Sequence, residues 1–290
     1  MVGFSVQALG EYGADYGLAI LKIAIFGAQL ALLWWIVNRA THFDDHSELF
    51  VRQNLSYAIQ RCGLLFGQGI AMWPLLGSTG RTGFDLAWLV GGGLWAMLLL
   101  GLLWPVLNRL VGHGDMTDPQ DRTERSTSVV RAAFFVASGL VISAGLSGEA
   151  PSITQGVIST VVFTALGLVV LYLAYLVNGR VPMFDRFSRH VADGNVAAAI
   201  IAAGFTLGLG LVLHKAIAGD FTTWGVSLAG FAITALVATA GFYLISWLMD
   251  TLIITSATLK QVVREDQRLA ATVTATMLVT VAAAVTALPL

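Results

Sequence analysis

Three polar residues spaced seven apart in an apolar stretch are the first candidates for chemistry in this sequence. Asn54, Arg61 and Gln68 share one face of a helix, because seven residues make about two helical turns. If the stretch crosses a bilayer, the charge of Arg61 costs at least about 2.5 kcal/mol near the centre, so its side chain must face protein, water or an anion. The spacing predicts a polar lining for a small ion or solute. The alternative is an arginine whose long side chain extends to the membrane surface.

The composition places these residues in a membrane protein. The 290 residues are 57% hydrophobic and 11% charged, with a mean hydropathy of +0.78, whereas a soluble domain carries about 25% charged residues. A membrane-spanning helix needs about 20 apolar residues. Segments of this length fit residues 16–38, 54–76, 84–107, 129–146, 155–177, 195–218, 223–249 and 269–288. The chain is therefore expected to be an all-α, polytopic protein with eight transmembrane helices and the lipid bilayer as its partner.

Several function classes are excluded by what the sequence contains. The 17 acidic residues nearly cancel the 16 basic ones, so no nucleic-acid partner is expected. The single cysteine, Cys62, rules out an intramolecular disulfide and a cysteine-rich zinc site. Metalloprotease, hydrolase, phosphate-loop and dinucleotide-binding motifs are missing. We therefore expect no enzyme, no cofactor and no metal site.

The basic residues predict an orientation. Twelve of the sixteen fall in the connections after the first, third, fifth and seventh spans, and the opposite side has only Arg81 and Lys215. Because basic loops stay in the cytoplasm, both termini are expected on the non-cytoplasmic side. The longest polar stretch, residues 112–128, is expected to be a solvated loop. Every Asp and Glu is expected in a loop or at a helix end, which disfavours a proton relay.

The sequence repeats itself at an offset of 141 residues. Residues 54–69 align without a gap on residues 195–210, and Phe43-Asp44 aligns on Phe184-Asp185. The identities are Asn54/Asn195, Ala58/Ala199, Ile59/Ile200, Gly63/Gly204, Gly67/Gly208 and Gly69/Gly210. This predicts two four-helix repeats, residues 1–147 and 148–290. An even number of spans gives both repeats the same sense in the membrane, unlike the inverted repeats of many carriers.

Two sets of repeated residues have a structural and a functional interpretation. Gly63 with Gly67, and Gly204 with Gly208, form small-xxx-small patterns that let helices approach closely, within the chain or in a homo-oligomer. Their alternative role is to expose backbone carbonyls to a permeant species. Asn195, like Asn54, is placed either to cap its helix or to make a polar contact at a cytoplasmic vestibule.

The run Asn195-Val-Ala-Ala-Ala-Ile200, followed by Gly204, Gly208 and Gly210, resembles the YjfL-type family of bacterial inner-membrane proteins. This family is built from four-helix units, often in tandem, and is catalogued as domain of unknown function 350. The resemblance covers the whole chain as two units and implies location in the bacterial inner membrane. It supplies no substrate and no catalytic residues. The first unit departs from the pattern, with Tyr57, Gln60 and Arg61 where the second is apolar.

Two functional classes remain. In the first, the protein is a channel or transporter-like protein that passes a small ion or solute between the repeats, with Asn54, Arg61, Gln68 and Asn195 as the polar lining. In the second, it is a non-transporting membrane scaffold or subunit that docks cytoplasmic partners through its basic residues and residues 112–128.

Overall fold

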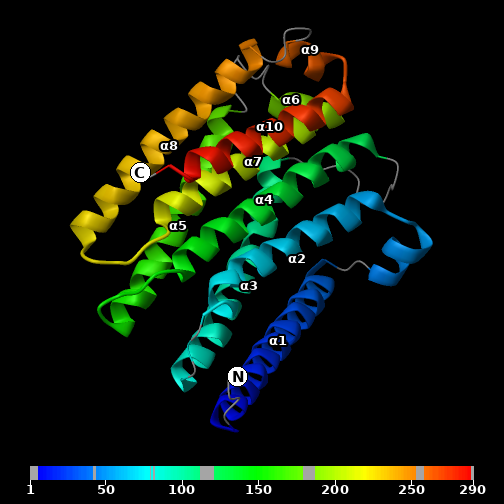
Figure 1. The fold of residues 1–290 in the computed structure, drawn as a ribbon. Helices are drawn as coiled ribbons and strands as arrows, with labels where there is room; N and C mark the ends of the chain where they lie inside the picture. The colour runs from blue at the N-terminus through cyan, green and yellow to red at the C-terminus, as the bar shows by residue number, and fades with distance from the viewer. Residues whose placement is uncertain are drawn as a thin grey trace, which may run out of the picture.

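The chain is a bundle of long helices (Figure 1). The computed structural model describes residues 6–41, 44–78, 80, 82–111, 121–178, 187–252 and 258–288. Within these residues every regular element is helical: α1 (Val6–Thr41), η1 (Ser47–Val51), α2 (Leu55–Leu76), α3 (Gly83–Val111), α4 (Arg122–Leu146), α5 (Ile153–Asn178), α6 (Phe187–Ala192), α7 (Val196–Ile217), α8 (Trp224–Leu252), α9 (Leu259–Arg264) and α10 (Arg268–Thr286). The expected all-α fold is confirmed.

Each of the eight segments expected to cross the membrane is a helix, but they are not alike in hydropathy. Among the described helices, seven are long and apolar enough to cross a bilayer, namely α1, α3, α4, α5, α7, α8 and α10. The eighth, α2, has the length but carries Gln60, Arg61 and Gln68, which lower its hydropathy. Three short helices that the hydropathy did not predict, η1, α6 and α9, precede α2, α7 and α10.

Four helices form a row at the centre of the bundle. α2, α4, α7 and α10 lie side by side and run in the same direction (Figure 1). α1 and α3 pack against α2, and α5 packs against both α4 and α7. α8 packs against α7 and α10. α2 and α4 of the first half thus correspond to α7 and α10 of the second, in the same sense, and the row joins the two halves through α4 and α7.

Three of the four repeated glycines, Gly63, Gly67 and Gly204, lie where two helix backbones meet. A Cβ atom on Gly63 would come within 2.5 Å of the Ala132 Cα of α4, and one on Gly204 within 2.6 Å of the Ala275 Cα of α10. Gly67 faces the Phe135 carbonyl in the same way, and Gly208 faces the ring of Phe242. Small residues permit membrane helices to approach this closely. Of the two roles considered for these glycines, these contacts correspond to helix packing.

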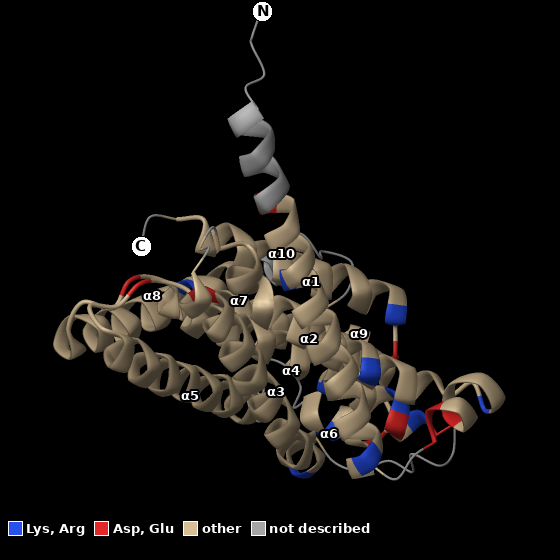
Figure 2. Ribbon diagram, turned by 90° about the horizontal axis from the view of Figure 1, so that it is seen from below, with Lys and Arg blue, Asp and Glu red and all other residues tan. Residues whose placement is uncertain are grey.

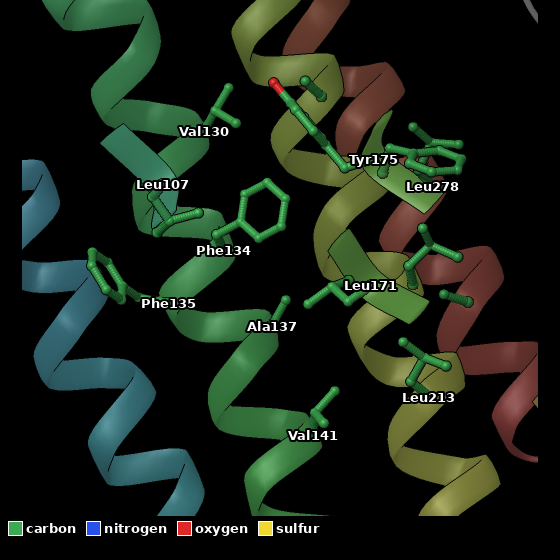
Figure 3. Packing of buried hydrophobic residues seen from close by; sticks show 14 of the residues in the cluster. Leu107, Val130, Phe134, Phe135, Ala137, Val141, Leu171, Tyr175, Leu213 and Leu278 are labelled. Atoms are coloured by element: carbon green, nitrogen blue, oxygen red, sulfur yellow. The ribbon is translucent and has the colours of Figure 1, made fainter. Parts of the chain in front are cut away.

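The apolar core lies at the junction of the two halves. Phe134 and Ala137 of α4 point toward Leu171 and Tyr175 of α5 and toward Leu213 of α7 (Figure 3). α4 and α7 are buried over most of their length, whereas α1, α3, α8 and α10 expose long apolar stretches. In a protein that crosses a membrane, lipid chains cover such surfaces. The exposed apolar side chains of these helices therefore contact lipid instead of water.

Charged residues gather at one end of the bundle, beside α6 (Figure 2). We call this the charged end; α2, α4, α7 and α10 all begin there. The expected solvated loop over residues 112–128 is wrong for its second part, because α4 begins at Arg122 and Ser126, Thr127 and Ser128 are fully buried. Residues 112–120 lie outside the described part. Asp121 caps α4 by accepting a hydrogen bond from the Thr123 N–H, so a sequence that reads as a polar loop is the capped first turn of a core helix.

Candidate functional site

Arg61 lies in a polar cluster between α1 and α2, close to the charged end. Its side chain is 3% exposed. Its Nη2 donates to the Asn38 Oδ1 at 2.7 Å and lies 3.3 Å from the Asp45 carboxylate. It also donates to the hydroxyl of Tyr57, which in turn donates to Asp45. The guanidinium stacks over Tyr57 and Trp34, 4.7 and 5.4 Å from the ring centroids. Arg61 is thus held inside the protein and does not extend to the surface.

Two glutamines converge one level deeper in the bundle. Gln68 of α2 is fully buried and donates to the Gly93 carbonyl of α3 at 3.3 Å. Gln29 of α1 donates to the Leu89 carbonyl at 3.2 Å, and its amide packs where a Cβ atom of Gly93 would otherwise lie. The Oε1 atoms of both glutamines are buried and receive no hydrogen bond from any described residue. Two amide oxygens are therefore available as acceptors in the interior of the first repeat.

Lys22 continues this line of polar groups toward the opposite end. Its Nζ donates to the Ser78 carbonyl at 2.5 Å and to the Ser78 hydroxyl at 3.1 Å. Ser78 lines a cavity of about 930 Å³ at the junction of the two repeats, which Asp85, Lys215 and Asp220 also line. Lys22, Gln29, Gln68 and Arg61, which we call the polar track, are buried at successive levels between this cavity and the charged end.

The two repeated asparagines are helix caps. The Asn54 Oδ1 accepts from the Tyr57 N–H at 3.2 Å and its Nδ2 donates to Glu48 at 3.0 Å. The Asn195 Oδ1 accepts from the Ala198 N–H at 2.7 Å. Of the two roles considered, capping accounts for both contacts. Asn54 and Asn195 therefore lie outside the polar track, which is confined to the first repeat.

Replacing Asn195 with alanine is expected to destabilise the protein by about 1 kcal/mol, because α7 loses its N-cap. The Asn195 Nδ2 also donates to the Val263 carbonyl at 2.6 Å, just before α10. Thermal unfolding in detergent would measure the change. Asn195→Ser keeps the capping acceptor and loses only the amide donor, so it should recover most of the loss; equal loss in both variants would contradict a capping role.

A buried ion pair is the main polar feature of the interior that the sequence did not reveal. Glu124 of α4 is fully buried and accepts from the Arg131 Nη1 at 3.1 Å. It also accepts from the Gln60 Nε2 at 2.8 Å and from the Ser128 hydroxyl at 3.2 Å. Glu124 lies in the first turn of α4, as expected for an acidic residue at a helix end, but its side chain is buried instead of solvated. The one available signal was the spacing of Glu124 and Arg131, seven residues apart on one helix face.

The second repeat builds the same framework without these polar groups. At the offset of 141 residues, Lys22, Gln29, Arg61 and Gln68 correspond to Phe163, Val170, Ala202 and Leu209. Ala202 and Leu209 are buried in α7 as their counterparts are in α2. The helices of the second repeat therefore pack without a charged or amide side chain at these four positions. Since such residues are costly inside a membrane and mark functional paths, packing alone does not account for the polar track.

Comparison with known proteins supports the repeat. A family described as Domain of Unknown Function (DUF350) matches residues 11–146 and, a second time, residues 152–288. A "UPF0719 transmembrane protein" of Aquifex aeolicus (strain VF5) is 23% identical over 202 residues, which cover 66% of this chain and 72% of that protein. No solved structure matches the chain.

These matches agree with the helices described above. The tandem repeat and the multi-pass membrane character are confirmed, while the narrower YjfL-type name stays a prediction. With two matched regions that together span most of its length, the chain belongs to the DUF350 family and is an integral membrane protein made of two tandem copies of that domain.

Proposed function

We propose that the protein passes a small ion or polar solute across the membrane along the polar track of its first repeat. One observation carries this proposal: four buried polar side chains, contributed by α1 and α2, lie at successive levels between a cavity at one end of the bundle and the charged end near Arg61. The sequence favoured a path between the repeats with Asn195 in its lining. The contacts favour a path inside the first repeat, because Asn195 caps α7.

The chemistry of the track suits a hydrated species. Lys22 and Arg61 stand toward the two ends, and between them the amide oxygens of Gln29 and Gln68 offer acceptors to water or to a bound ion. The charge of Arg61 is balanced by Asp45 at 3.3 Å. Weak, multiple contacts of this kind suit passage, because a permeating species must leave as readily as it enters.

The proposal includes α2 as an eighth span. α2 is 22 residues long, about 33 Å at 1.5 Å per residue, which matches the hydrocarbon thickness. α4 and α3 cover it on two sides, so its polar residues face protein instead of lipid. With eight spans both termini lie on the same side, and the basic residues of the charged end favour that end as cytoplasmic in the inner membrane.

A flux assay on sealed liposomes tests the proposal. Purified protein should carry chloride, potassium or an uncharged polyol such as glycerol faster than protein-free vesicles. Gln68→Leu should reduce the rate about tenfold, which corresponds to about 1.4 kcal/mol in the barrier. Leucine already occupies the equivalent position, Leu209, so the variant should fold. Gln261→Leu makes the same substitution at an exposed glutamine and should leave the rate unchanged.

Two results would count against it. If wild type carries none of the three probes, the non-transporting alternative, a scaffold or subunit that docks cytoplasmic partners, becomes the better account. If wild type carries a probe and Gln68→Leu carries it equally well, the path lies elsewhere. The alternative is less favoured because several cations of the charged end already contact acids of the same chain, as Arg52 does with Glu48 and Arg268 with Asp266.

A further inference from the structure

The central row of helices ends on two unlike edges. Within the row, α4 has a neighbour on each side, α2 and α7, whereas α10 has a row neighbour, α7, on one side only. The row is formed from two copies of the same unit, so each edge can be compared with an interface that exists inside the chain. The outer face of α10 corresponds to the face of α4 that packs against α7. The outer face of α2 corresponds to the face of α7 that packs against α4.

The α10 edge is exposed where its counterpart is buried. Ala132 and Ala275 pack on the equivalent glycines Gly63 and Gly204, which sets the offset between α4 and α10 at 143 residues. Five residues of α4 at this face are buried: Ser126, Val130, Ala133, Ala137 and Val141. Their counterparts in α10 are all exposed: Leu269, Val273, Thr276, Thr280 and Ala284.

The α2 edge shows the same contrast. Gly210 of α7 packs on α4, where a Cβ atom would lie 2.9 Å from the Ala137 Cα. Its counterpart Gly69 meets only the ring tip of Phe26, at 3.9 Å. The side chains that flank Gly69 on the outer face, Phe66 and Trp73, are exposed and large. The position equivalent to a glycine that packs on a helix backbone thus has no helix packed on it, and it lies between two exposed aromatic side chains.

The shapes of the two edges fit each other. Thr272, Val273, Thr276, Met277 and Thr280 line a groove of about 380 Å³ on the outer face of α10. A groove of small side chains on one edge and projecting aromatic side chains on the other are complementary, as in knobs-into-holes packing. The offsets place Thr280 opposite Gly69, because Ala137 lies opposite Gly210.

A second contact at the charged end agrees with this pairing. Inside the chain, the Ser126 hydroxyl donates to the Val191 carbonyl of α6 at 2.6 Å, and both residues are fully buried. Their counterparts are Leu269 and Phe50, which are 87% and 74% exposed. Large apolar side chains this exposed beside charged residues lose the hydrophobic stabilisation that burial would provide.

We propose that the outer face of α10 in one copy of the chain packs against the outer face of α2 in the next copy, as α4 packs against α7 within one chain. The occupant of each edge is a second copy, because the internal interface already shows what covers the same face. The contact joins two different surfaces, so it is head-to-tail, and it closes into a ring when the rotation between copies divides a full turn. Leu269 then meets Phe50 of the neighbouring copy.

Cross-linking through the single native cysteine tests the pairing. α4 and α7 run in parallel, with Arg122 beside Gly194 and Ala137 beside Gly210. Two turns before Gly210, the same register places Ala203 at the level of Val130, so Cys62 should lie at the level of Val273 of the neighbouring copy. In membranes that contain the full chain, copper phenanthroline and air should link Cys62 to Val273→Cys. Each of the two thiols loses a proton and an electron to oxygen, and dimers and larger products should appear on non-reducing gels.

The controls separate this arrangement from the alternatives. Leu236→Cys places a thiol at a position of α8 that is more exposed than Val273, and it should give only background cross-linking with Cys62. Val273→Cys combined with Cys62→Ser should form no cross-link and should run at the monomer position on the same gels. Efficient cross-linking of wild type through Cys62 alone would show a symmetric α2 to α2 contact and overturn the proposal. Cross-linking of Val273→Cys no stronger than that of Leu236→Cys would also overturn it.

A second measurement needs no new thiol. Gly69→Trp fills the open space on α2 and should shift the particle in mild detergent from the oligomer to the monomer mass, with an unchanged circular dichroism spectrum. Gly101→Trp makes the same change in α3, where nothing lies within 4 Å of a Cβ atom, and should leave the mass unchanged. A wild-type particle of monomer mass, or an oligomer that Gly69→Trp leaves intact, would contradict the proposal.

Discussion

Replacing Gly204 with leucine is expected to lower the free energy of unfolding by about 3 kcal/mol, at the upper end of what overpacking a tight core costs. The reason is the distance of 2.6 Å between a Cβ atom at this position and the Ala275 Cα. The obstacle is backbone, which cannot rotate away, so α7 and α10 must separate. Thermal unfolding followed by tryptophan fluorescence in detergent, together with expression level, would measure the effect.

The chain offers matched variants for this experiment. Gly63→Leu at the equivalent position of α2 should have a similar effect, because Ala132 stands where Ala275 stands. Gly241→Leu in α8 meets nothing within 4 Å and should leave the melting temperature unchanged. Wild-type stability in Gly204→Leu and Gly63→Leu would show that these glycines do not act through helix packing, and would favour their role in exposing backbone carbonyls.

Neutralising Glu124 is the second change with a large expected effect. Glu124→Gln should destabilise the protein by about 3 kcal/mol, because it removes the carboxylate 3.1 Å from Arg131 at a fully buried position. Arg131→Met should cost a similar amount for the converse reason. Unfolding midpoints of the two single variants and of wild type, measured in the same detergent, give the individual losses.

The double variant distinguishes pairing from packing. Combining Glu124→Gln with Arg131→Met removes both charges, so it should be no less stable than either single variant, and a coupling energy of more than about 1 kcal/mol is expected between the two sites. The second repeat supplies a precedent, with Gln267 and Thr274 at the equivalent positions. Losses that simply add would show that the two residues act independently.

Helix positions and the repeat were predictable because they depend on local properties of the chain. A segment of about 20 apolar residues forms a helix in a bilayer whatever its neighbours are, since no water is present to satisfy its backbone. The shared register of Asn54 and Asn195 was visible as a plain sequence offset. The one large error, the loop over residues 112–128, arose because the polar residues of the first turn of α4 resemble those of a solvated loop.

The polar track was predictable only in part. The spacing of Arg61 and Gln68 placed them on one helix face, but their partners Asn38, Asp45 and Gly93 belong to other elements. Depth along one helix does not tell which neighbouring helix supplies a contact. For the same reason the sequence did not show that the ammonium group of Lys22 binds Ser78, 56 residues away in the chain.

The sequence by itself determined that the protein lies in a lipid bilayer. It also determined the number and places of the long helices and their duplication, because hydropathy and repetition can be read along the chain. Only the tertiary structure decided which polar groups are buried together, and that α4 is enclosed while its counterpart α10 is exposed. Burial is set by helices that are distant in sequence, and two similar helices acquire different environments when one lies inside the row and the other at its edge.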